Sequence, residues 1–452
     1  MTGTRPAPGP HGRLAQGARR VLLDNWTGTS TVPSRTLYPH QWSWDSAFIA
    51  IGLRHLMPHR AQRELETLFG AQWGDGRIPH IVFNPAVPRD AYFPGPDFWR
   101  SATAGAAAGA PARPETSGIV QPPVHALAAL LTHRADPDAS VRSGFLDRAY
   151  PRLAAWHGYL TRARDLGGHG LVSAVHPWEP GMDNSPCWDA PLARVTPVPP
   201  GAFHRADLDH GAAADRPTDL DYGRYVRLAT DYRDRGYRDG GHRDGAAPDT
   251  GFAVEDPGTN ALLIASEHAL AEIAMAIGAD PGPHRIRAAR LTAALVDRLW
   301  SAATGLFLCR DVRTDTLVPE RSAAGLLPLL LPDLPPAVRR ALLATLRGEH
   351  FGLGRTVRLV PSYDLLGAAF DPFRYWRGPA WFNVNWLLER GLRLHGETAT
   401  ADALRTAVLE SAAASGFAEY VDPYTGRARG TRAFSWTAAL ALDLALAPES
   451  GV

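Results

Sequence analysis

Apolar residues recur every three or four positions through most of the chain, which is the period of a helix with one buried face. In the segment 260–277, for example, Leu263, Leu270, Ile273 and Ile277 fall on one side. Alternating apolar and polar runs, which are typical of strands, are short and few. The helical period covers residues 46–56, 60–73, 124–133, 145–164, 222–232, 260–277, 286–299, 320–330, 336–347, 381–394, 398–414 and 436–446. The chain is therefore expected to be all-α.

About a dozen helices joined by loops can form either a solenoid or a closed ring of helical hairpins. A solenoid would show a repeat of fixed length, and none of ~30–45 residues is visible. We therefore expect a ring with the site at one end, because loops on a rigid scaffold carry function. The aromatic-rich connections are 36–45, 76–100, 175–190, 371–381 and 417–436. Their spread over the chain indicates one site in one domain.

Composition excludes several classes of protein. The chain has 452 residues, with 47 basic and 46 acidic side chains and a net charge of +1. Nucleic-acid binding usually requires a concentrated basic face, so no such partner is expected. No apolar run reaches ~18 residues, so no membrane-spanning helix is expected. Motifs for dinucleotides, nucleotide phosphates and catalytic zinc are missing, and we expect neither a cofactor nor a metal.

The cysteine count and the N-terminal segment bear on location. Cys187 and Cys309 are too few for a disulfide framework, and they agree with a reducing compartment. Residues 1–18 are rich in Pro, Gly and Arg and lack the apolar stretch of a secretion signal. We therefore expect a flexible tail over 1–18 and a cytoplasmic protein. The sequence leaves open whether the chain forms a homo-oligomer.

A stretch of low complexity runs from residue 232 to residue 249. It repeats Tyr-Arg-Asp-like units and contains many glycines. Such composition is typical of a solvated surface loop. The alternative is that it forms part of a lid over a substrate, within a lid-like insertion at about 190–250.

Two loops combine acidic and aromatic residues. The segment 176–186 carries Trp178 and Asp183 among several prolines, and the segment 417–423 carries Glu419 between aromatic neighbours. An indole ring packs on the apolar face of a sugar, and a carboxylate handles hydroxyls and protons. Hydrolysis of a glycosidic bond requires two such carboxyls, one protonated and one ionised. The two loops therefore predict a glycosidase site.

Other assignments of these carboxyls stay open at this point. Asp183 could instead cap a turn with its neighbours, as aspartate often does. Glu179 and Asp189 lie close to it in the chain and are rival candidates. Asp422 is followed by a proline and is expected to start a turn.

Two further aromatic segments are candidates for the walls of a sugar pocket. Trp42, Trp44 and Asp45 come directly before the helix predicted over 46–56. Asp45 could accept bonds from two sugar hydroxyls, or it could simply cap the helix. The segment 375–383 places four aromatic residues around a Gly-Pro turn, which could be a pocket wall or the buried start of a helix.

A basic residue near these motifs suggests an acidic substrate. Arg216 lies shortly before Tyr222, and a guanidinium can bind a carboxylate through two parallel hydrogen bonds. The alternative is an ordinary surface arginine.

The motifs together resemble a known family. Gln-Trp-x-Trp-Asp at 41–45, Gly-Met-Asp-Asn-Ser-Pro at 181–186 and Trp-Arg-Gly-Pro-x-Trp at 376–381 occur in that order, and 434–437 reads Phe-Ser-Trp-Thr. Over residues 20–447 the chain resembles glycoside hydrolase family 63, and within it the bacterial mannosylglycerate and glucosylglycerate hydrolases. The resemblance implies a single (α/α)6 barrel over 19–452 and an inverting mechanism.

The resemblance also implies roles for individual residues. Asp183 stands where the family has its general acid, and Glu419 stands where it has its general base. The positions that line the sugar subsite are Tyr38, Trp42, Trp44, Asp45, Gln121, Trp178, Gly181, Trp376 and Trp381. The positions on the glycerate side are Tyr92, Arg216, Tyr222 and Tyr375.

The resulting prediction is an inverting hydrolase of a small α-glucoside or α-mannoside of D-glycerate. One alternative is a trehalase-like or oligosaccharide α-glucosidase on the same scaffold, which would not need Arg216. Alternatives of another class are a sugar epimerase, which commonly relies on paired histidines, and a sugar-binding protein without catalysis. The choice between glucose and mannose stays open.

Overall fold

The computed structural model describes residues 10–208, 213–239 and 251–447. Within these residues, six helices pack side by side as an inner ring: α2 (Ser43–Leu53), α6 (His125–Ala135), α11 (Pro257–Ala276), η7 (Ala323–Leu330), α14 (Phe382–Leu394) and α16 (Ser435–Leu446). Each contacts the next, and α16 contacts α2, so the ring is closed. The all-α prediction and the ring of helical hairpins are confirmed.

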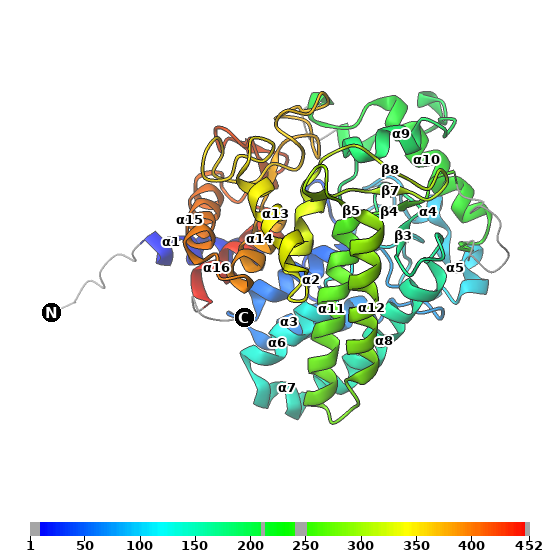
Figure 1. Ribbon diagram of the computed structural model, residues 1–452. Helices are drawn as coiled ribbons and strands as arrows, with labels where there is room; N and C mark the ends of the chain where they lie inside the picture. Colours follow the sequence, from blue (N-terminus) through cyan, green and yellow to red (C-terminus); the bar gives the residue numbers. More distant parts are fainter. Residues whose placement is uncertain (1–9, 209–212, 240–250, 448–452) are drawn as a thin grey trace.

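A second layer of helices covers the ring from outside (Figure 1). Its members are α1 (Pro10–Asp24), α3 (Pro58–Phe69), α8 (Phe145–Ala163), α12 (Gly282–Leu299), α13 (Pro336–Arg347) and α15 (Thr398–Ala414). The sequence explains the two layers. Every residue of α2 is buried, whereas α3 buries only one face, as an amphipathic helix does when it packs on a core.

The prediction of a flexible tail over 1–18 was wrong for residues 10–18. These residues form the first part of α1, which packs against α16 and completes the outer layer. Leu14, Ala18 and Leu22 recur every four residues and are buried. This apolar stripe outweighs the glycine and arginine content on which the tail prediction rested. Residues 1–9 lie outside the described part of the chain.

Helices η7 and α2 also differ from their predictions. The segment predicted as a helix over 320–330 is the 3₁₀ helix η7, which has Pro328 inside it. Proline lacks the N–H that a regular α-helix would use there. Helix α2 begins at Ser43, three residues earlier than predicted, and Asp45 therefore lies in its first turn and does not cap it.

Short strands of two residues gather at one end of the ring, where connections lead into the inner helices. They are β1 (Gln41–Trp42) with β2 (Ile81–Val82); β3 (Ser173–Ala174), β4 (Val254–Glu255), β7 (Arg310–Asp311) and β8 (Thr316–Leu317); β5 (Trp300–Ser301) with β6 (Leu306–Phe307); and β9 (Ala380–Trp381), β10 (Tyr420–Val421) and β11 (Ala428–Arg429). All pairs are antiparallel. In Figure 1 the sheet of β3, β4, β7 and β8 lies at the end of α11 and α12 that is opposite α7 (Pro137–Ser143).

Short helices complete the connections. They are α4 (Pro96–Trp99), α5 (Ser101–Ala104), η1 (Ala106–Ala108), η2 (Pro186–Trp188), α9 (Asp189–Leu192), η3 (Pro200–Ala202), η4 (Ala206–Leu208), η5 (Ala213–Asp215) and α10 (Asp219–Asp234). Helix α10 begins three residues before its predicted start because Thr218 and Asp221 form a reciprocal capping box. None of the described helices is long and apolar enough to cross a membrane.

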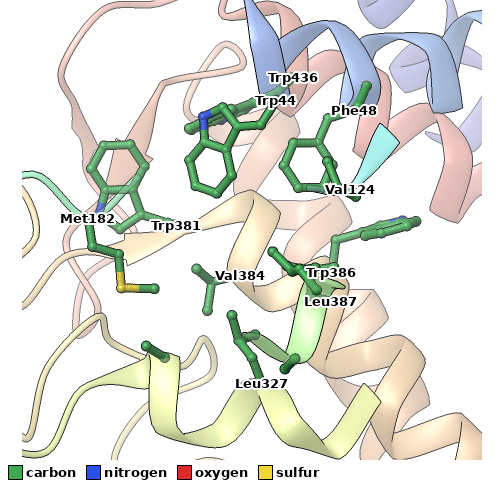
Figure 2. Close-up of a cluster of buried hydrophobic side chains, with 14 of the residues drawn as sticks. Trp44, Phe48, Val124, Met182, Leu327, Trp381, Val384, Trp386, Leu387 and Trp436 are labelled. Carbon is green, nitrogen blue, oxygen red and sulfur yellow. The ribbon is translucent and has the colours of Figure 1, made fainter. Parts of the chain in front are cut away.

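The hydrophobic core fills the ring and reaches the end where the strands lie. Trp44 contacts Trp436 edge-to-face at 5.4 Å between ring centroids and Phe48 at 5.6 Å. Figure 2 shows these rings continuing into the side chains of Trp386 and Leu387 between the inner helices. The core therefore packs against the aromatic residues at this end of the ring and fixes their positions.

Candidate active site

A cavity of about 740 Å³, part of it open to solvent, lies at the end of the ring where the inner helices begin. Every residue that the sequence analysis placed in the site lines this cavity: Tyr38, Trp42, Trp44, Asp45, Tyr92, Gln121, Trp178, Gly181, Asp183, Arg216, Tyr222, Tyr375, Trp376, Trp381 and Glu419. The structure thus brings together residues from segments up to about four hundred positions apart. A concave site with aromatic walls and a few convergent polar groups is typical of a site for a small molecule.

Sequence reasoning missed some lining residues: Pro33, His80, Asp207, Pro217, Phe434 and Trp436. Phe434 and Trp436 belong to a motif that was noted without a role. His80 lies in a connection that was noted for its aromatic residues. Asp207 belongs to none of the motifs, and in the structure it pairs with Arg205, two residues earlier, at 2.6 Å.

Burial keeps the imidazole of His80 neutral. It is 5% exposed, and burial lowers its pKa to about 3. Its ring lies over that of Trp178, and it therefore forms part of the aromatic wall.

Glu419 is held in place by several donors. The hydroxyls of Tyr38 and Tyr375 donate to its Oε1 at 3.0 and 3.5 Å, and the Thr431 N–H donates to its Oε2 at 3.1 Å. Arg216 Nη2 lies 3.9 Å from Oε2. The strand pair β10–β11 fixes the backbone, since the Glu419 N–H donates to the Thr431 carbonyl. Both carboxylate oxygens are therefore oriented by the protein.

Burial and hydrogen bonding act in opposite directions on Glu419. Burial raises the pKa of this carboxyl above its usual value, while Arg216 and the donors from Thr431, Tyr38 and Tyr375 lower it. The net direction is upward. Donors that favour the ionised form are what a carboxylate base requires.

Asp183 is held differently, through its neighbours. The Tyr225 hydroxyl donates to the Asp183 backbone carbonyl at 3.0 Å, and the Trp376 N–H donates to Asn184 Oδ1 at 2.9 Å. The carboxyl itself is half-buried at the cavity wall. Ser185, and not Asp183, caps the following η2, since its hydroxyl accepts the Cys187 N–H. The turn at Asp183 is closed by the backbone, since the Ser185 N–H donates to the Met182 carbonyl at 3.0 Å.

The pKa of the Asp183 carboxyl lies far above its usual value. Burial raises its pKa to about 8, and the nearby Glu419 carboxylate adds to this rise, while Arg216 opposes it. A carboxyl with this pKa is mostly protonated at neutral pH and can donate a proton. The two carboxyls share one cavity in contrasting environments.

The rival carboxyls lie elsewhere. Glu179 is buried in an ion pair with Arg164 at 2.7 Å, and Asp189 pairs with Arg377 at 2.5 Å near the surface. Asp422 accepts the N–H groups of two following residues and starts a turn, as expected. None of the three lines the cavity.

The part of the cavity beside Asp45 has rigid aromatic walls. Trp376 and Trp381 stack in parallel with centroids 3.8 Å apart. Gln121 Oε1 accepts the Trp44 N–H at 3.0 Å, which fixes the start of α2. The Asp45 side chain is buried there, and burial raises its pKa well above the usual value.

Arg216 lies between the carboxyls and the tyrosines. Its Nη1 donates to the Tyr38 hydroxyl at 3.0 Å, and its guanidinium lies 4.8 Å from the ring centroid of Tyr375. It is 5% exposed, so it is not an ordinary surface arginine. Tyr222 lines the cavity from α10, and its hydroxyl donates to the Phe93 carbonyl.

The loops of the helical ring gather two carboxyls and a set of indole rings in one cavity, and glycoside hydrolysis requires such a pair of carboxyls. A family model described as the mannosylglycerate hydrolase MGH1-like glycoside hydrolase domain matches residues 38–437. The chain belongs to this family of glycoside hydrolases, within family 63. Its fold is an (α/α)6 barrel.

Individual relatives are similar over almost their whole length. A mannosylglycerate hydrolase of Rubrobacter radiotolerans is 43% identical over 438 residues, which cover 96% of this chain and 97% of the relative. A glucosylglycerate hydrolase of Mycolicibacterium hassiacum is 39% identical and covers 95% and 97%. The crystal structure of the family 63 mannosylglycerate hydrolase of Thermus thermophilus with Tris and D-glycerate is 39% identical, with a TM-score of 0.85 over 95% of this chain and 99% of that one.

Proposed function

We propose that the protein hydrolyses a small α-glucoside or α-mannoside of D-glycerate, with inversion at the anomeric carbon. The observation that carries the proposal is the pairing of Asp183 and Glu419 in one cavity, with different hydrogen-bond partners, beside a buried arginine. The named activities of the relatives, and the D-glycerate complex of the Thermus enzyme, support the same substrate class.

In the proposed reaction, protonated Asp183 donates its proton to the glycosidic oxygen as the bond to the anomeric carbon breaks. Glu419 removes a proton from a water molecule that attacks the anomeric carbon from the opposite face. An inverting enzyme needs room for this water, with the two carboxyls about 6.5–9.5 Å apart. The raised pKa of Asp183 and the donors around Glu419 support this division of roles.

Two groups of residues would hold the substrate. The sugar would lie against Trp42, Trp44, Trp178, Trp376 and Trp381, with Asp45, Gln121, Tyr38 and Gly181 around its hydroxyls. The glycerate would lie toward Arg216, Tyr222, Tyr375 and Tyr92. Arg216 is the natural partner for the glycerate carboxylate, because among the described residues that line the cavity it is the one with a permanent positive charge.

The lid-like insertion at about 190–250 belongs to this proposal. Its described part supplies Asp207, Arg216, Pro217 and Tyr222 to the cavity wall, on the proposed glycerate side. We propose one catalytic domain that includes α1, so the boundary expected at residue 19 moves at least to residue 10. The near-neutral net charge and the free, buried Cys187 and Cys309 support a cytoplasmic enzyme that acts on small molecules.

Product release from purified protein tests the substrate class. Glucosylglycerate and mannosylglycerate are offered side by side, with trehalose as a control. Preferential cleavage of a glycerate glycoside is expected, and the faster substrate identifies the sugar. Cleavage of trehalose alone would replace the glycerate glycoside with a neutral disaccharide. A lack of cleavage of all three would contradict the proposal.

Arg216→Ala tests the glycerate side separately. Because Arg216 also contacts Tyr38 and Glu419, the variant is expected to lose activity on every substrate. The informative quantity is the rise in KM, which should be larger for the glycerate glycoside than for a neutral α-glucoside. Arg224→Ala, in α10 outside the cavity lining, is the matched control. An equal rise for both substrates would remove Arg216 as the carboxylate partner.

A further inference from the structure

The low-complexity segment is tied into the protein interior at its described end. Tyr237 is fully buried, and its hydroxyl donates to the Trp99 carbonyl. The guanidinium of Arg77 donates to the Tyr237 carbonyl at 2.8 Å. The interpretation of 232–249 as a solvated surface loop was therefore wrong for residues 232–239. Residues 240–249 lie outside the described part of the chain.

The anchor is the carboxylate of Asp239, whose side chain is 4% exposed. The hydroxyls of Tyr159 and Tyr232 donate to it, each at 2.6 Å. Arg164 Nε lies 2.8 Å from its Oδ1, and Arg77 Nη2 lies 3.5 Å from its Oδ2. Burial alone would raise the pKa of Asp239, but the two guanidiniums and two hydroxyls hold it below its usual value. The carboxylate is therefore a fixed negative charge inside the protein.

Arg164 connects this anchor to the loop that carries Asp183. While its Nε faces Asp239, its Nη1 and Nη2 donate to the two oxygens of Glu179 at 2.7 and 2.8 Å. Glu179 lies four residues before Asp183 and next to Trp178. The buried guanidinium of Arg164 thus binds Asp239 of the glycine-rich segment through Nε and Glu179 of the loop that carries Asp183 through Nη1 and Nη2.

Glu179 in turn fixes two backbone segments at the cavity. It accepts the Val175 N–H at 2.8 Å and the Val120 N–H at 3.3 Å. Val120 precedes Gln121, whose side chain accepts the Trp44 N–H at 3.0 Å. The contacts form a continuous path from Asp239 through Arg164 and Glu179 to both segments.

We propose that Asp239 is a positioning residue for the reaction. It does not line the cavity, and it acts by holding Arg164, and through it Glu179, in the orientation that places the Asp183 loop and the Gln121 segment. Removing the Asp239 charge takes the carboxylate from Arg164 Nε while Glu179 still binds Nη1 and Nη2, so the guanidinium is no longer held by carboxylates on both sides and can shift. A misplacement of about 1 Å at a catalytic group can lower the rate by ~10²-fold. The inference rests on the proposed function only in the experiments that measure turnover.

The Asp239→Asn variant, in the full-length protein, tests the proposal. The expected result is a kcat lower by roughly 10- to 100-fold with a smaller change in KM, since the aromatic walls beside Asp45 are held by the core. Asp234→Asn is the matched control, because Asp234 occupies the same place in the preceding Tyr-Arg-Asp unit. Its side chain is 52% exposed, and it pairs with Arg233 near the surface. The control should keep the wild-type kcat.

Hydrogen exchange provides a second readout that does not depend on turnover. In Asp239→Asn, backbone exchange in 173–183 and 118–121 should become faster, while α14 and α15 on the far side of the ring keep wild-type protection. Faster exchange everywhere would mean general destabilisation and would overturn the proposal, as would wild-type exchange in both segments or a wild-type kcat. If the wild-type protein cleaves no glycerate glycoside, the proposed function fails, and exchange alone decides the inference.

Milder variants keep the test open if Asp239→Asn does not fold. Tyr232→Phe and Tyr159→Phe each remove one hydrogen bond to the Asp239 carboxylate and leave its charge in place. Each should lower kcat several-fold and speed exchange in 173–183. Wild-type values for both variants would overturn the proposal.

Discussion

The two carboxyls of the cavity differ in what surrounds them. Glu419 comes immediately before strand β10 and receives three hydrogen bonds from Tyr38, Tyr375 and Thr431, with Arg216 nearby. Asp183 lies on an irregular loop whose backbone is fixed, while its carboxyl faces the cavity half-buried. The first arrangement orients an acceptor, and the second isolates a proton donor. The difference between these two surroundings supports the proposed roles more strongly than the surroundings of either residue do alone.

The largest expected effect comes from removing either ionisable group. Asp183→Asn and Glu419→Gln should each lower kcat by about 10²–10⁴-fold while the fold is kept, because each removes one proton-transfer step. Asp189→Asn is the matched control, since this carboxylate lies six residues from Asp183 but pairs with Arg377 near the surface. Steady-state kinetics and circular dichroism check the result. Unchanged turnover in either variant would remove that residue from the mechanism.

A smaller effect should follow from removing one donor to Glu419. Tyr38→Phe loses the hydroxyl that donates to Oε1, and a hydrogen bond to a charged group contributes about 1.5–3 kcal/mol. A loss of roughly 10-fold or more in kcat/KM is expected. Because this bond lowers the pKa of Glu419, its removal should raise that pKa and move the acid limb of the pH profile to higher pH.

Tyr225→Phe is the control on the other side of the comparison. Its hydroxyl donates to the Asp183 backbone carbonyl and not to a carboxylate. Its loss should leave the acid limb in place. Equal shifts of the limb in the Tyr38 and Tyr225 variants would mean that the two carboxyls are not held differently.

Two glycines allow each side of the site to be disturbed separately. A Cβ at Gly430 would clash with Glu419 Oε2, and a Cβ at Gly181 would lie 2.5 Å from the Trp44 ring. Both have a positive φ, as does Gly396 (φ 76°), where a Cβ would meet nothing within 4 Å. Gly396→Ala should therefore cost only the left-handed backbone strain of about 1–2 kcal/mol.

The two site variants should cost more than that control. Gly430→Ala and Gly181→Ala add a steric clash, which is worth a further ~1–3 kcal/mol in a packed region. Urea unfolding measures the free energy of unfolding of all three variants. Activity per folded molecule should fall in the two site variants alone. Equal losses of stability in all three would contradict the close packing around both carboxyls.

A pH-dependent gain of stability in Asp183→Asn is expected as well. Burial raises the pKa of Asp183 from an unfolded value near 3.8 to about 8, so the folded protein binds one proton more than the unfolded chain between these values. The wild type therefore loses stability relative to the variant as the pH rises from about 4 to about 8. Thermal unfolding should give equal melting temperatures near pH 4 and a higher one for the variant at pH 8. A difference that does not change with pH would contradict the raised pKa.

How much the sequence could predict depended on the range of the contacts involved. Helices α13 and α15 begin and end where predicted, because their apolar period is local. Helix α1 was missed because glycine and arginine obscured a stripe whose partner, α16, lies at the other end of the chain. The cavity-lining residues that belong to motifs were predicted from the sequence. The Asp239 anchor was not, because it depends on ion pairs with Arg77 and Arg164, which lie far earlier in the chain. Asp207 was also missed, although its ion-pair partner Arg205 lies only two residues away.

The configuration of the first hexose released tests the central claim most directly. Proton NMR of the fresh reaction in heavy water resolves the two anomers before they interconvert. With an α-linked glycerate glycoside, Glu419 activating water opposite Asp183 predicts that the β-anomer is released first and the α-anomer grows in later by mutarotation. First release of the α-anomer would mean retention, and it would contradict the proposed roles of both carboxyls.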